Sequence, residues 1–558
     1  MLFSSSVDGS SPLRLLAFVL LPAALLVYTA SLVIYRIFFH PLAKYPGPLL
    51  AKITDLYSTY HALRGDRHLD FYRIHEQYGP IVRFGPNSLS FNSNTALKDI
   101  YGFKSNVRKA RFYEAFWATK DSFSTHSAIS KSIHARKRRV LSHAFSDSAI
   151  KSMENHILAH IRQFCQNLSG PSNPSTHRTT FASVPSSPES KGYGPPINIT
   201  NQSNYLTFDI MGDLCFGKSF SMLETPHNHF AIDLIASAAH RHLICGTYLP
   251  IHTFHLDKLL FPKIASGRSR YMTYSKQQAA ERTHQTTADT ISRKDFFHHL
   301  LNATDPETNQ GFSVPELWGE SNLLIIAGSD TTSTALAATI FYLVHNPRAL
   351  SLVTRTIRST FSAIEDIHIS SPLHSLTYLR ASIDEAMRLA PSVGGLLPRE
   401  VLAGGIVIDD ERIPAGTVIG VPHYAIQHNE KFFPAAFDFV PERWIAGSVW
   451  PTSSSSPGQG VEVTSEAVSL AQSAFCPFSV GPRGCIGKGM AYNELMLTLA
   501  RMMFMYDMRL APGSTLGEGT PETKEYGRHR RAEFQLQDTF TSMKEGPLVQ
   551  FRPRELSS

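Results

Sequence analysis

The sequence predicts a mainly α-helical protein with a minor β-sheet region, preceded by one N-terminal transmembrane helix. Three observations predict this fold class: a charge-free apolar stretch at Leu15–Ile34, helical spacing of apolar residues through most of the chain, and strand-like segments gathered in Arg399–Val421. Apolar residues make up 42% of the 558 residues, and the 34 glycines bring the composition into the globular range. A disordered or collagen-like chain is therefore excluded.

The N-terminal apolar stretch is long enough to cross a membrane. Its twenty residues would form a helix of about 30 Å, which matches the hydrocarbon core of a bilayer. A cleaved signal peptide is the alternative, but the apolar part of such peptides is normally only about 7–15 residues long. The positive-inside rule places the rest of the chain in the cytosol, because Arg14 alone precedes the stretch and Arg36, His40, Lys44 and Lys52 follow it.

The sequence predicts three successive parts, of which the last and longest is one soluble body. We predict an anchor over 1–36, a stiff proline-rich hinge over 37–48 and a single domain over 49–558. Pro/Ser-rich stretches near 169–196 and 447–467 are expected to be surface insertions, because such compositions bury little apolar surface. The net charge of 53 − 46 = +7 does not indicate a nucleic-acid partner. Five cysteines without a CxxC pair argue against a disulfide framework or a structural zinc site.

A long apolar helix is predicted between Ser313 and Pro347. Ser313 and Glu316 can form a capping box at its start, and Pro347 would end it. Its centre reads AGSDTT, where Asp330 is costly in an apolar segment unless it is paired, and the Thr331 hydroxyl can bond the carbonyl one turn earlier. A second membrane span and an ordinary core helix with satisfied polar residues are the alternatives.

The next segments predict a helix and then a small sheet. Apolar residues recur every three or four positions from Leu376 to Met387, and this pattern stops at Pro391. Glu385 and Arg388 are spaced to pair on that helix, although taken alone such a pair is more typical of a solvated surface. Further on, GIVI and TVIGV read as strands of short hairpins.

The segment Phe478–Gly487, with sequence FSVGPRGCIG, carries the strongest chemical signal. If the sulfur of Cys485 ligates a metal in a cofactor, Phe478 would shield the sulfur from water and Arg483 would offer a fixed cation to an anionic group. The glycines of the segment are expected to allow positive φ and to bring backbone N–H groups to the thiolate; they are Gly481, Gly484 and Gly487.

Two alternatives to this interpretation are weaker. A phosphate-binding loop would need glycine where Pro482 stands and serine or threonine where Gly489 stands. Cys476 is the rival thiol, but its FCPF context supplies no glycine cradle, and buried apolar cysteine is the usual state at such a site.

Taken together, these segments resemble the cytochrome P-450 (haem-thiolate monooxygenase) superfamily, from the hinge to the C-terminus. HPLAKYPGP, SHAFS and PRGCIGKG are similar to filamentous-fungal members that act in secondary metabolism. The resemblance implies the cytochrome P-450 fold over 49–558, haem b (iron protoporphyrin IX) as the cofactor, and Cys485 as the axial ligand of the haem iron. Phe478 belongs to the same cofactor-binding segment.

The resemblance also assigns roles to other residues. It implies that Asp330 and Thr331 relay protons for oxygen activation. It implies a structural role for Glu385, Arg388 and Arg443, the last of these in PERW, where the family commonly ends in Phe rather than Trp.

Two haem carboxylates need cations, and the candidates are His134, Arg138, Arg399 and Arg483. His134 and Arg138 are four apart and therefore share one helix face, although the family often has Trp at the first of these positions. The other basic residues of this run are expected to stay exposed and to suit the docking of an acidic redox partner; they are Lys131, Arg136, Lys137 and Arg139.

The function implied by this resemblance is a monooxygenase that inserts one oxygen atom from O2 into an apolar small molecule. No dinucleotide or flavin fingerprint occurs, so electrons are expected from a separate NADPH–cytochrome P-450 reductase, with cytochrome b5 as a further candidate partner. The expected location is the endoplasmic reticulum membrane, single-pass, with the catalytic domain in the cytosol. A haem-thiolate isomerase or dehydratase that needs no reductase and a non-catalytic haem-binding sensor are the alternatives.

Overall fold

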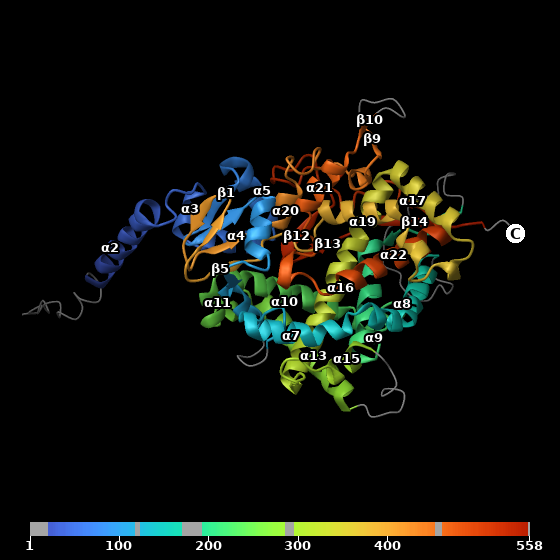
Figure 1. The fold of residues 1–558 in the computed structure, drawn as a ribbon, viewed down its shortest axis with the longest axis horizontal. Coiled ribbons are helices and arrows are strands. Elements are labelled where there is room, and N and C mark those ends of the chain that lie inside the picture. The colour runs from blue at the N-terminus through green and yellow to red at the C-terminus, as the bar shows by residue number, and fades with distance from the viewer. Residues whose placement is uncertain (1–19, 118–122, 170–191, 285–294, 452–459, 556–558) are drawn as a thin grey trace, which may run out of the picture.

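The computed structural model describes residues 20–117, 123–169, 192–284, 295–451 and 460–555. Helices dominate this part of the chain and the strands form small sheets (Figure 1), which confirms the predicted fold class. The helices are α2 (Leu21–Ile34), α3 (Leu49–Ile53), α4 (Leu56–Arg64), α5 (Arg67–Tyr78), α6 (Asn94–Tyr101), α7 (Lys131–Ala144), α8 (Asp147–Leu168), α9 (Ile199–Phe216), α10 (Phe230–Thr247), α11 (Leu249–Thr253), α12 (Asp257–Leu260), α13 (Pro262–His284), α15 (Phe296–Asn302), α16 (Val314–His345), α17 (Pro347–Thr360), α18 (Ser371–His374), α19 (Thr377–Leu389), α20 (His423–Gln427), α21 (Ser465–Ala474) and α22 (Lys488–Met505).

The strands are β1 (Ile81–Gly85), β2 (Ser88–Phe91), β3 (Val107–Lys109), β4 (Ile197–Asn198), β5 (Arg399–Val401), β6 (Ile406–Ile408), β7 (Glu411–Ile413), β8 (Val418–Gly420), β9 (Val449–Pro451), β10 (Gly460–Glu462), β11 (Tyr506–Leu510), β12 (Leu536–Thr539), β13 (Thr541–Lys544) and β14 (Leu548–Pro553). The largest sheet has the order β1-β2-β8-β5-β3. The predicted hairpin is found in β6 and β7, whereas β8 pairs in parallel with β2.

Three strands of the largest sheet come from residues 81–109, a region where the sequence predicted no strand. All four residues of β2 are buried, as are four of the five in β1. The segment of β1 (IVRFG) does not alternate apolar and polar residues, and β2 (SLSF) alternates over only four residues. Both are therefore weaker strand signals than the longer run in Arg399–Val421.

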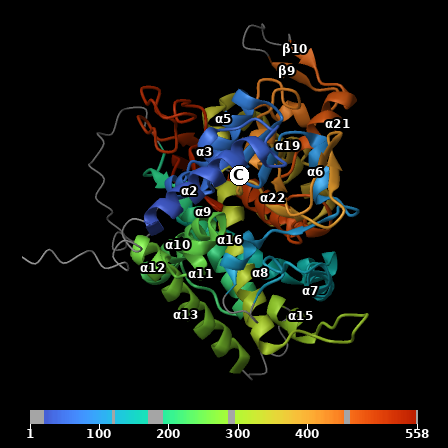
Figure 2. The ribbon, with the colours of Figure 1, turned by 90° about the vertical axis from the view of Figure 1, so that its left-hand side faces the viewer.

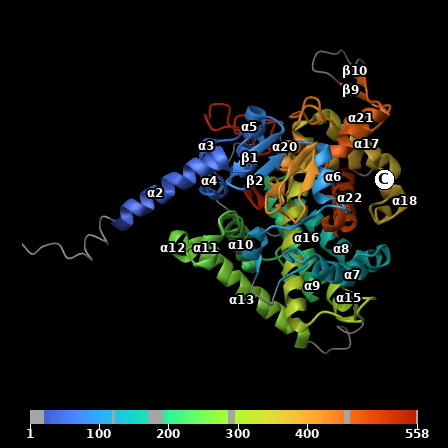
Figure 3. The ribbon, with the colours of Figure 1, turned by 60° about the vertical axis from the view of Figure 1, so that its left-hand side comes forward.

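Helix α2 projects from the body and buries none of its residues (Figures 1 and 3). The helix continues through a π-helical turn at Tyr35–Phe39, and Leu21–Phe39 is a candidate membrane span with mean hydropathy 1.7. Residues 15–19 of the predicted span lie outside the described residues. The backbone leaves helical geometry at His40, and the carbonyl of Arg36 accepts a hydrogen bond from Arg83 Nη1 at 2.8 Å, which ties this end of α2 to the body.

Helix α16 runs through the middle of the molecule (Figure 2). The predicted capping box is present, with Ser313 at the N-cap and its N–H donating to the Glu316 carboxylate at 3.0 Å, and the helix ends at His345, two residues before Pro347. Its most apolar window is 67% buried inside the protein, so α16 is a core helix rather than a second membrane span.

A buried ionic cluster fastens α19 to the 3₁₀ turn Pro441–Trp444. Glu385 and Arg388 are fully buried, and the Glu385 carboxylate lies 2.9 Å from guanidinium nitrogens of both Arg388 and Arg443. Trp444 donates its indole N–H to the same carboxylate at 3.0 Å. The pair is therefore part of the core and not a solvated surface pair, and the tryptophan supplies a hydrogen bond that phenylalanine could not.

The predicted insertions fall mostly on residues 170–191 and 452–459, outside the described residues. Around the second of them, β9 and β10 pair as an antiparallel ladder, and α21 begins at Ser465.

Candidate active site

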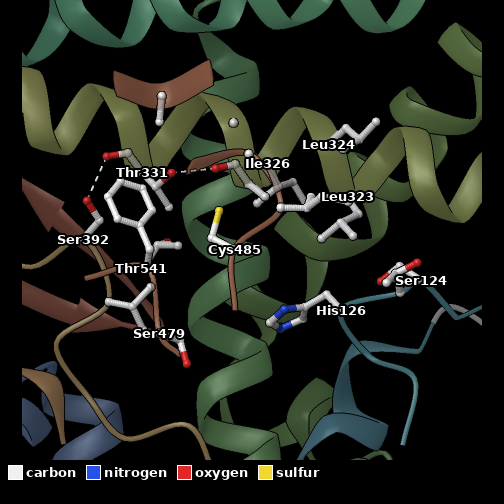
Figure 4. Close-up of a pocket in the computed structure, with 18 of the residues that line it drawn as sticks. Ser124, His126, Leu323, Leu324, Ile326, Thr331, Ser392, Ser479, Cys485 and Thr541 are labelled. Carbon is white, nitrogen blue, oxygen red and sulfur yellow. Dashed lines mark hydrogen bonds between the residues drawn. The ribbon is translucent and has the colours of Figure 1, made fainter. Parts of the chain in front are cut away.

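A cavity of about 360 Å³ lies beside α16, and its wall includes Cys485 and Thr331 (Figure 4). Cys485 comes from the loop before α22, and Thr331 comes from the middle of α16. The close-up shows both side chains at the same part of the cavity, with His126 on the other side of Cys485. The structure thus brings together the two sequence segments that carried the chemical signals.

The loop around Cys485 is held by its backbone. The Cys485 N–H donates to the Phe478 carbonyl at 2.8 Å, and Gly484 N–H donates to the Gly481 carbonyl at 3.0 Å. Gly481 has φ +70°, and a Cβ at this position would lie 2.0 Å from the carbonyl oxygen of Tyr101. Glycine is therefore required there both by the dihedral angle and by the close approach to α6.

The other two glycines do not behave as predicted. Gly484 has φ −62° and Gly487 has φ −82°, so neither uses the positive φ that the sequence analysis expected of them. Gly487 instead lies close to the Cys485 sulfur, since a Cβ at this position would be 3.9 Å from it. The Gly487 N–H acts to lower the pKa of the Cys485 thiol.

Cys485 is the one cysteine of the five whose side chain is accessible, and its accessible surface faces the cavity. Burial raises the pKa of its thiol, while the Gly487 N–H, Arg138 and Lys488 act in the opposite direction. Cys476 is buried, and burial raises the pKa of its thiol much further. Of the two rival thiols, only Cys485 is placed to act as a ligand to a group in the cavity.

A cluster of buried cations lies beside the same cavity. Strands β3 and β5 are antiparallel with Lys109 directly opposite Arg399, and both side chains are buried. Like charges at paired positions destabilise a sheet unless an anion compensates them. Arg483 adds a third cation, and its guanidinium donates to the Ala128 carbonyl at 2.5 Å.

Helix α7 contributes Arg138 to this cluster and places His134, a neutral ring, on the same helix face. Arg138 Nη1 donates to the Gly484 carbonyl at 2.6 Å. Burial, followed by Arg483, lowers the pKa of His134 to about 3. Burial and then the neighbouring Arg399 lower the pKa of Arg483 to about 10. Burial, Arg399 and Arg483 hold the pKa of Lys109 well below its usual range.

The residues of this cluster fit an anionic cofactor. Across the described residues, none of its cations forms an ion pair with a carboxylate. Their hydrogen bonds go instead to backbone carbonyls and one tyrosine hydroxyl: Lys109 to His126 O, Arg138 to Gly484 O, Arg399 to Tyr113 Oη, Leu397 O and Pro398 O, and Arg483 to Ala128 O, Ile129 O and Ser130 O. Two carboxylates of a haem would compensate these charges, and the accessible thiol of Cys485 lies on the same cavity.

Sequence reasoning missed two residues of this site, Lys109 and His126. His126 lines the cavity, its Nε2 is buried without a hydrogen-bond partner, and burial and then Lys109 hold its pKa well below the usual range. Both residues reach the site through long-range packing, and neither lies in a local pattern that would have indicated it.

The prediction that four basic residues of α7 remain exposed is wrong for three of them. Lys137 is buried and pairs with Glu320 at 3.2 Å, and Arg139 pairs with Asp305 at 2.6 Å. Arg136 is partly buried and pairs with Glu316. Their carboxylate partners lie about 170–180 residues away in the sequence, so the pattern of α7 alone could not show them. Lys131 is exposed as predicted.

Asp330 and Thr331 occupy different surroundings although they are adjacent. Thr331 lines the cavity, and its hydroxyl donates to the Ala327 carbonyl at 2.6 Å, as predicted. Asp330 lies about 100° further around the helix. Its carboxylate is ion-paired at 3.0 Å with the buried Nζ of Lys544, from β13.

Known proteins are similar in sequence to this chain along most of its length. The family model described as Cytochrome P450 matches residues 44–524. The chain is 38% identical over 533 residues to cytochrome P450 monooxygenase AKT7 of Alternaria alternata, covering 95% of this chain and 97% of that protein. It is 38% identical over 548 residues to cytochrome P450 monooxygenase atnE of Emericella nidulans, covering 97% of each. It is also 32% identical over 501 residues to a trichothecene C-15 hydroxylase of Fusarium sporotrichioides, covering 88% of this chain and 92% of that protein.

Proposed function

The chain belongs to the cytochrome P450 family of haem monooxygenases, and from this premise we propose that it inserts one atom of O2 into an apolar small molecule bound beside Cys485. The single observation that carries this proposal is the cavity, which joins one accessible thiol, a cluster of cations that form no ion pair with a carboxylate of the described residues, and an apolar wall. That wall includes Phe116, Leu323, Leu324, Ile326 and Phe540.

In this proposal the haem iron is bound by the Cys485 thiolate. When bound, the haem supplies the oxygen-activating chemistry that side chains lack. The Gly487 N–H and the nearby Arg138 stabilise the anionic form of the sulfur. Phe478 lines the cavity beside the sulfur, where it limits the access of water.

The two haem carboxylates would be held by the cation cluster, with the neutral ring of His134 as a further hydrogen-bond donor. His134 and Arg138 approach from α7, Arg399 from β5 and Arg483 from the loop before Cys485. Lys109 and His126 join them as positions added by the structure. Haem binding would then replace the mutual repulsion of buried cations with ion pairs.

Protons would reach the cavity through α16. The Thr331 hydroxyl donates its hydrogen to the Ala327 carbonyl. Its oxygen is therefore free to accept a hydrogen bond from a proton donor in the cavity. Asp330 would supply protons from the other side of the helix once its contact with Lys544 loosens.

Electrons would come from a separate NADPH–cytochrome P-450 reductase, with cytochrome b5 as a further candidate donor. The cations that remain exposed near the Cys485 loop are fewer than the sequence suggested. Lys131 and Lys488 are exposed there, and both could contact an acidic redox partner.

The proposed location is the endoplasmic reticulum membrane, with the body on the cytosolic side. Helices α3 and α12 lie at the end of the body from which α2 projects (Figure 3), and each exposes a large apolar side chain. Leu50 of α3 is 64% exposed and Leu259 of α12 is 80% exposed. These side chains would rest in the membrane interface beside an inserted α2.

The relatives narrow the class of substrate. Those compared above are fungal proteins, and one is named a trichothecene C-15 hydroxylase. We place this chain in the biosynthesis of a fungal secondary metabolite, with a small apolar molecule as its substrate.

The test is reconstitution of the holoenzyme with an NADPH–cytochrome P-450 reductase and an extract of metabolites under ¹⁸O2. The proposal predicts a product that contains one ¹⁸O atom and that forms only when NADPH and reductase are both present. Turnover without reductase or O2 would instead establish an isomerase or dehydratase. Haem binding without any turnover would establish a sensor.

A further inference from the structure

Two arginines and one aspartate lie next to His242, a residue of α10 that lines the cavity. Arg241 and Asp257 form a buried ion pair at 2.7 Å, with each side chain 4% exposed. Arg268 of α13 lies close to them but has no carboxylate within ion-pairing distance among the described residues. Two guanidinium groups therefore share one carboxylate, and burial and then Arg241 lower the pKa of Arg268 to about 10.

Arg268 acts on the cavity through His242. Its Nε donates to His242 Nε2 at 3.2 Å, and its Nη2 donates to the Trp117 carbonyl at 3.0 Å. His242 lines the cavity and stacks on Phe116 with a centroid distance of 4.6 Å. Because an arginine N–H always donates, His242 Nε2 is the acceptor, and the proton of the neutral ring is on Nδ1. Nδ1 has no partner among the described residues.

Two further donors line the same cavity from α16. Trp318 Nε1 is buried without a hydrogen-bond partner. Asn322 lies one helical turn further on the same face, and its Oδ1 already accepts from Tyr271 at 2.5 Å and from Ser275 at 3.0 Å. Within the part of the chain that the structure describes, its Nδ2 has only the sulfur of Met272, at 4.0 Å. All three groups are therefore N–H donors, and the acceptor atoms of His242 and Asn322 are already used.

Helix α13 places these donors side by side. Arg268 and Tyr271 are three residues apart, so they share one face of the helix. Arg268 holds His242, and Tyr271 holds Asn322. The ring of His242 and the amide of Asn322 are thus fixed to neighbouring positions of one helix. A group that satisfies several N–H donors next to an uncompensated guanidinium is an anion with several acceptor oxygens.

We propose that the part of the cavity lined by His242 and Asn322 binds the carboxylate of an otherwise apolar substrate, with these two residues as donors and Arg268 as the compensating charge. This inference rests on the proposed monooxygenase function. Asn322 and Thr331 are nine residues apart on α16, about 13 Å along its axis. A carboxylate held at Asn322 therefore places the opposite, apolar end of a chain-like substrate beside Thr331 and Cys485, where oxidation occurs.

Equilibrium dialysis with the full-length holoenzyme in detergent, at a pH where carboxylic acids are ionised, tests this site. The probes are octanoic, decanoic, dodecanoic and tetradecanoic acid and the amide of each. We expect at least one acid to bind about tenfold more tightly than its amide. Arg268→Gln and His242→Phe should reduce that preference to about threefold or less, and Arg268→Lys should keep part of it.

Arg270→Gln is the matched control, because Arg270 is an exposed cation on the same helix. It should keep the wild-type preference. Equal binding of every acid and its amide, failure of every acid to bind, or an unchanged preference in both Arg268→Gln and His242→Phe would overturn the proposal. The carbon monoxide spectrum of each variant distinguishes failure of the carboxylate site from failure of the proposed function, because that spectrum reports the haem-thiolate bond and not the carboxylate site.

Discussion

The Thr331 hydroxyl is the α16 side-chain group that we assign to proton delivery beside Cys485. Thr331 lines the cavity and donates to the Ala327 carbonyl, so Thr331→Ala removes the hydroxyl without changing any residue of the cation cluster. We expect NADPH consumption to continue while product falls severalfold and hydrogen peroxide rises, because protons no longer arrive at the right position.

Thr331→Ser is the control for this change, since it restores the hydroxyl and should restore most of the coupling. The ratio of product to NADPH, measured together with peroxide, reports the effect. Unchanged coupling in Thr331→Ala would remove this residue from the mechanism and would strengthen the isomerase alternative.

Glu494 is a buried acid whose titration should be visible in the stability of the protein. It lines the cavity from α22, its Oε1 has no hydrogen-bond partner, and burial raises its pKa to about 8. In the unfolded chain the pKa is about 4.3. Between these values only the folded state holds the proton, so the free energy of unfolding falls as pH rises from about 4.3 to 8.

The expected slope from this one group is at most about 1.4 kcal/mol per pH unit. Glu494→Gln removes this contribution, so the thermal midpoint of the variant should rise relative to that of wild type as pH is raised from 5 to 8. Parallel pH profiles of the two proteins would show that Glu494 is ionised in the folded state.

At the scale of single elements, the Cys485 loop depends on one glycine. A Cβ at Gly481 would lie 2.0 Å from the Tyr101 carbonyl oxygen, whereas a Cβ at Gly489, in the first turn of α22, would meet no atom within 4 Å. Gly481→Ala should therefore push the loop away from α6 and lower the haem content of the purified protein severalfold.

Gly489→Ala should leave the haem content unchanged and should stabilise α22 slightly. Haem content per polypeptide, from absorbance and protein concentration, separates the two variants. Full haem content in Gly481→Ala would mean that the loop can shift without disturbing Cys485.

The elements differ in how far the sequence predicted them. The ends of α16 were predictable because a capping box and a proline mark them locally. Strands β1 to β3 were not, because each spans only three to five residues and β1 does not alternate apolar and polar residues. The place of Lys109 in the cation cluster depends on strand register opposite Arg399, which is a long-range property.

The same reasoning explains the outcome for the candidate site. The segments that carry Cys485 and Thr331 were recognisable because their chemistry is concentrated in a few consecutive residues. The burial of Lys137 was not, because it depends on Glu320, far away in the sequence. Long-range ion pairing and strand register thus limited what the sequence alone could show.

At the scale of the whole molecule, the orientation in the membrane can be tested with the chain's own sequons. Asn167, Asn198, Asn201 and Asn302 each begin an N-x-[ST] sequence. Asn201 and Asn302 are exposed in the folded body. If the body is cytosolic, none of the four meets the lumenal glycosylation machinery.

Expression in a eukaryotic host followed by endoglycosidase treatment measures this directly. We expect no change in electrophoretic mobility. A faster band after treatment would place the body in the lumen, away from the proposed reductase, and would favour a cleaved signal peptide.

The most direct test of the site is the spectrum of the reduced protein with carbon monoxide. An anionic sulfur ligand gives the Soret band a strong red shift, so wild type and Cys476→Ala should both show it. Cys485→His should abolish it while retaining bound haem. A red-shifted band that survives in Cys485→His, or that disappears in Cys476→Ala, would contradict the assignment of Cys485 as the haem ligand.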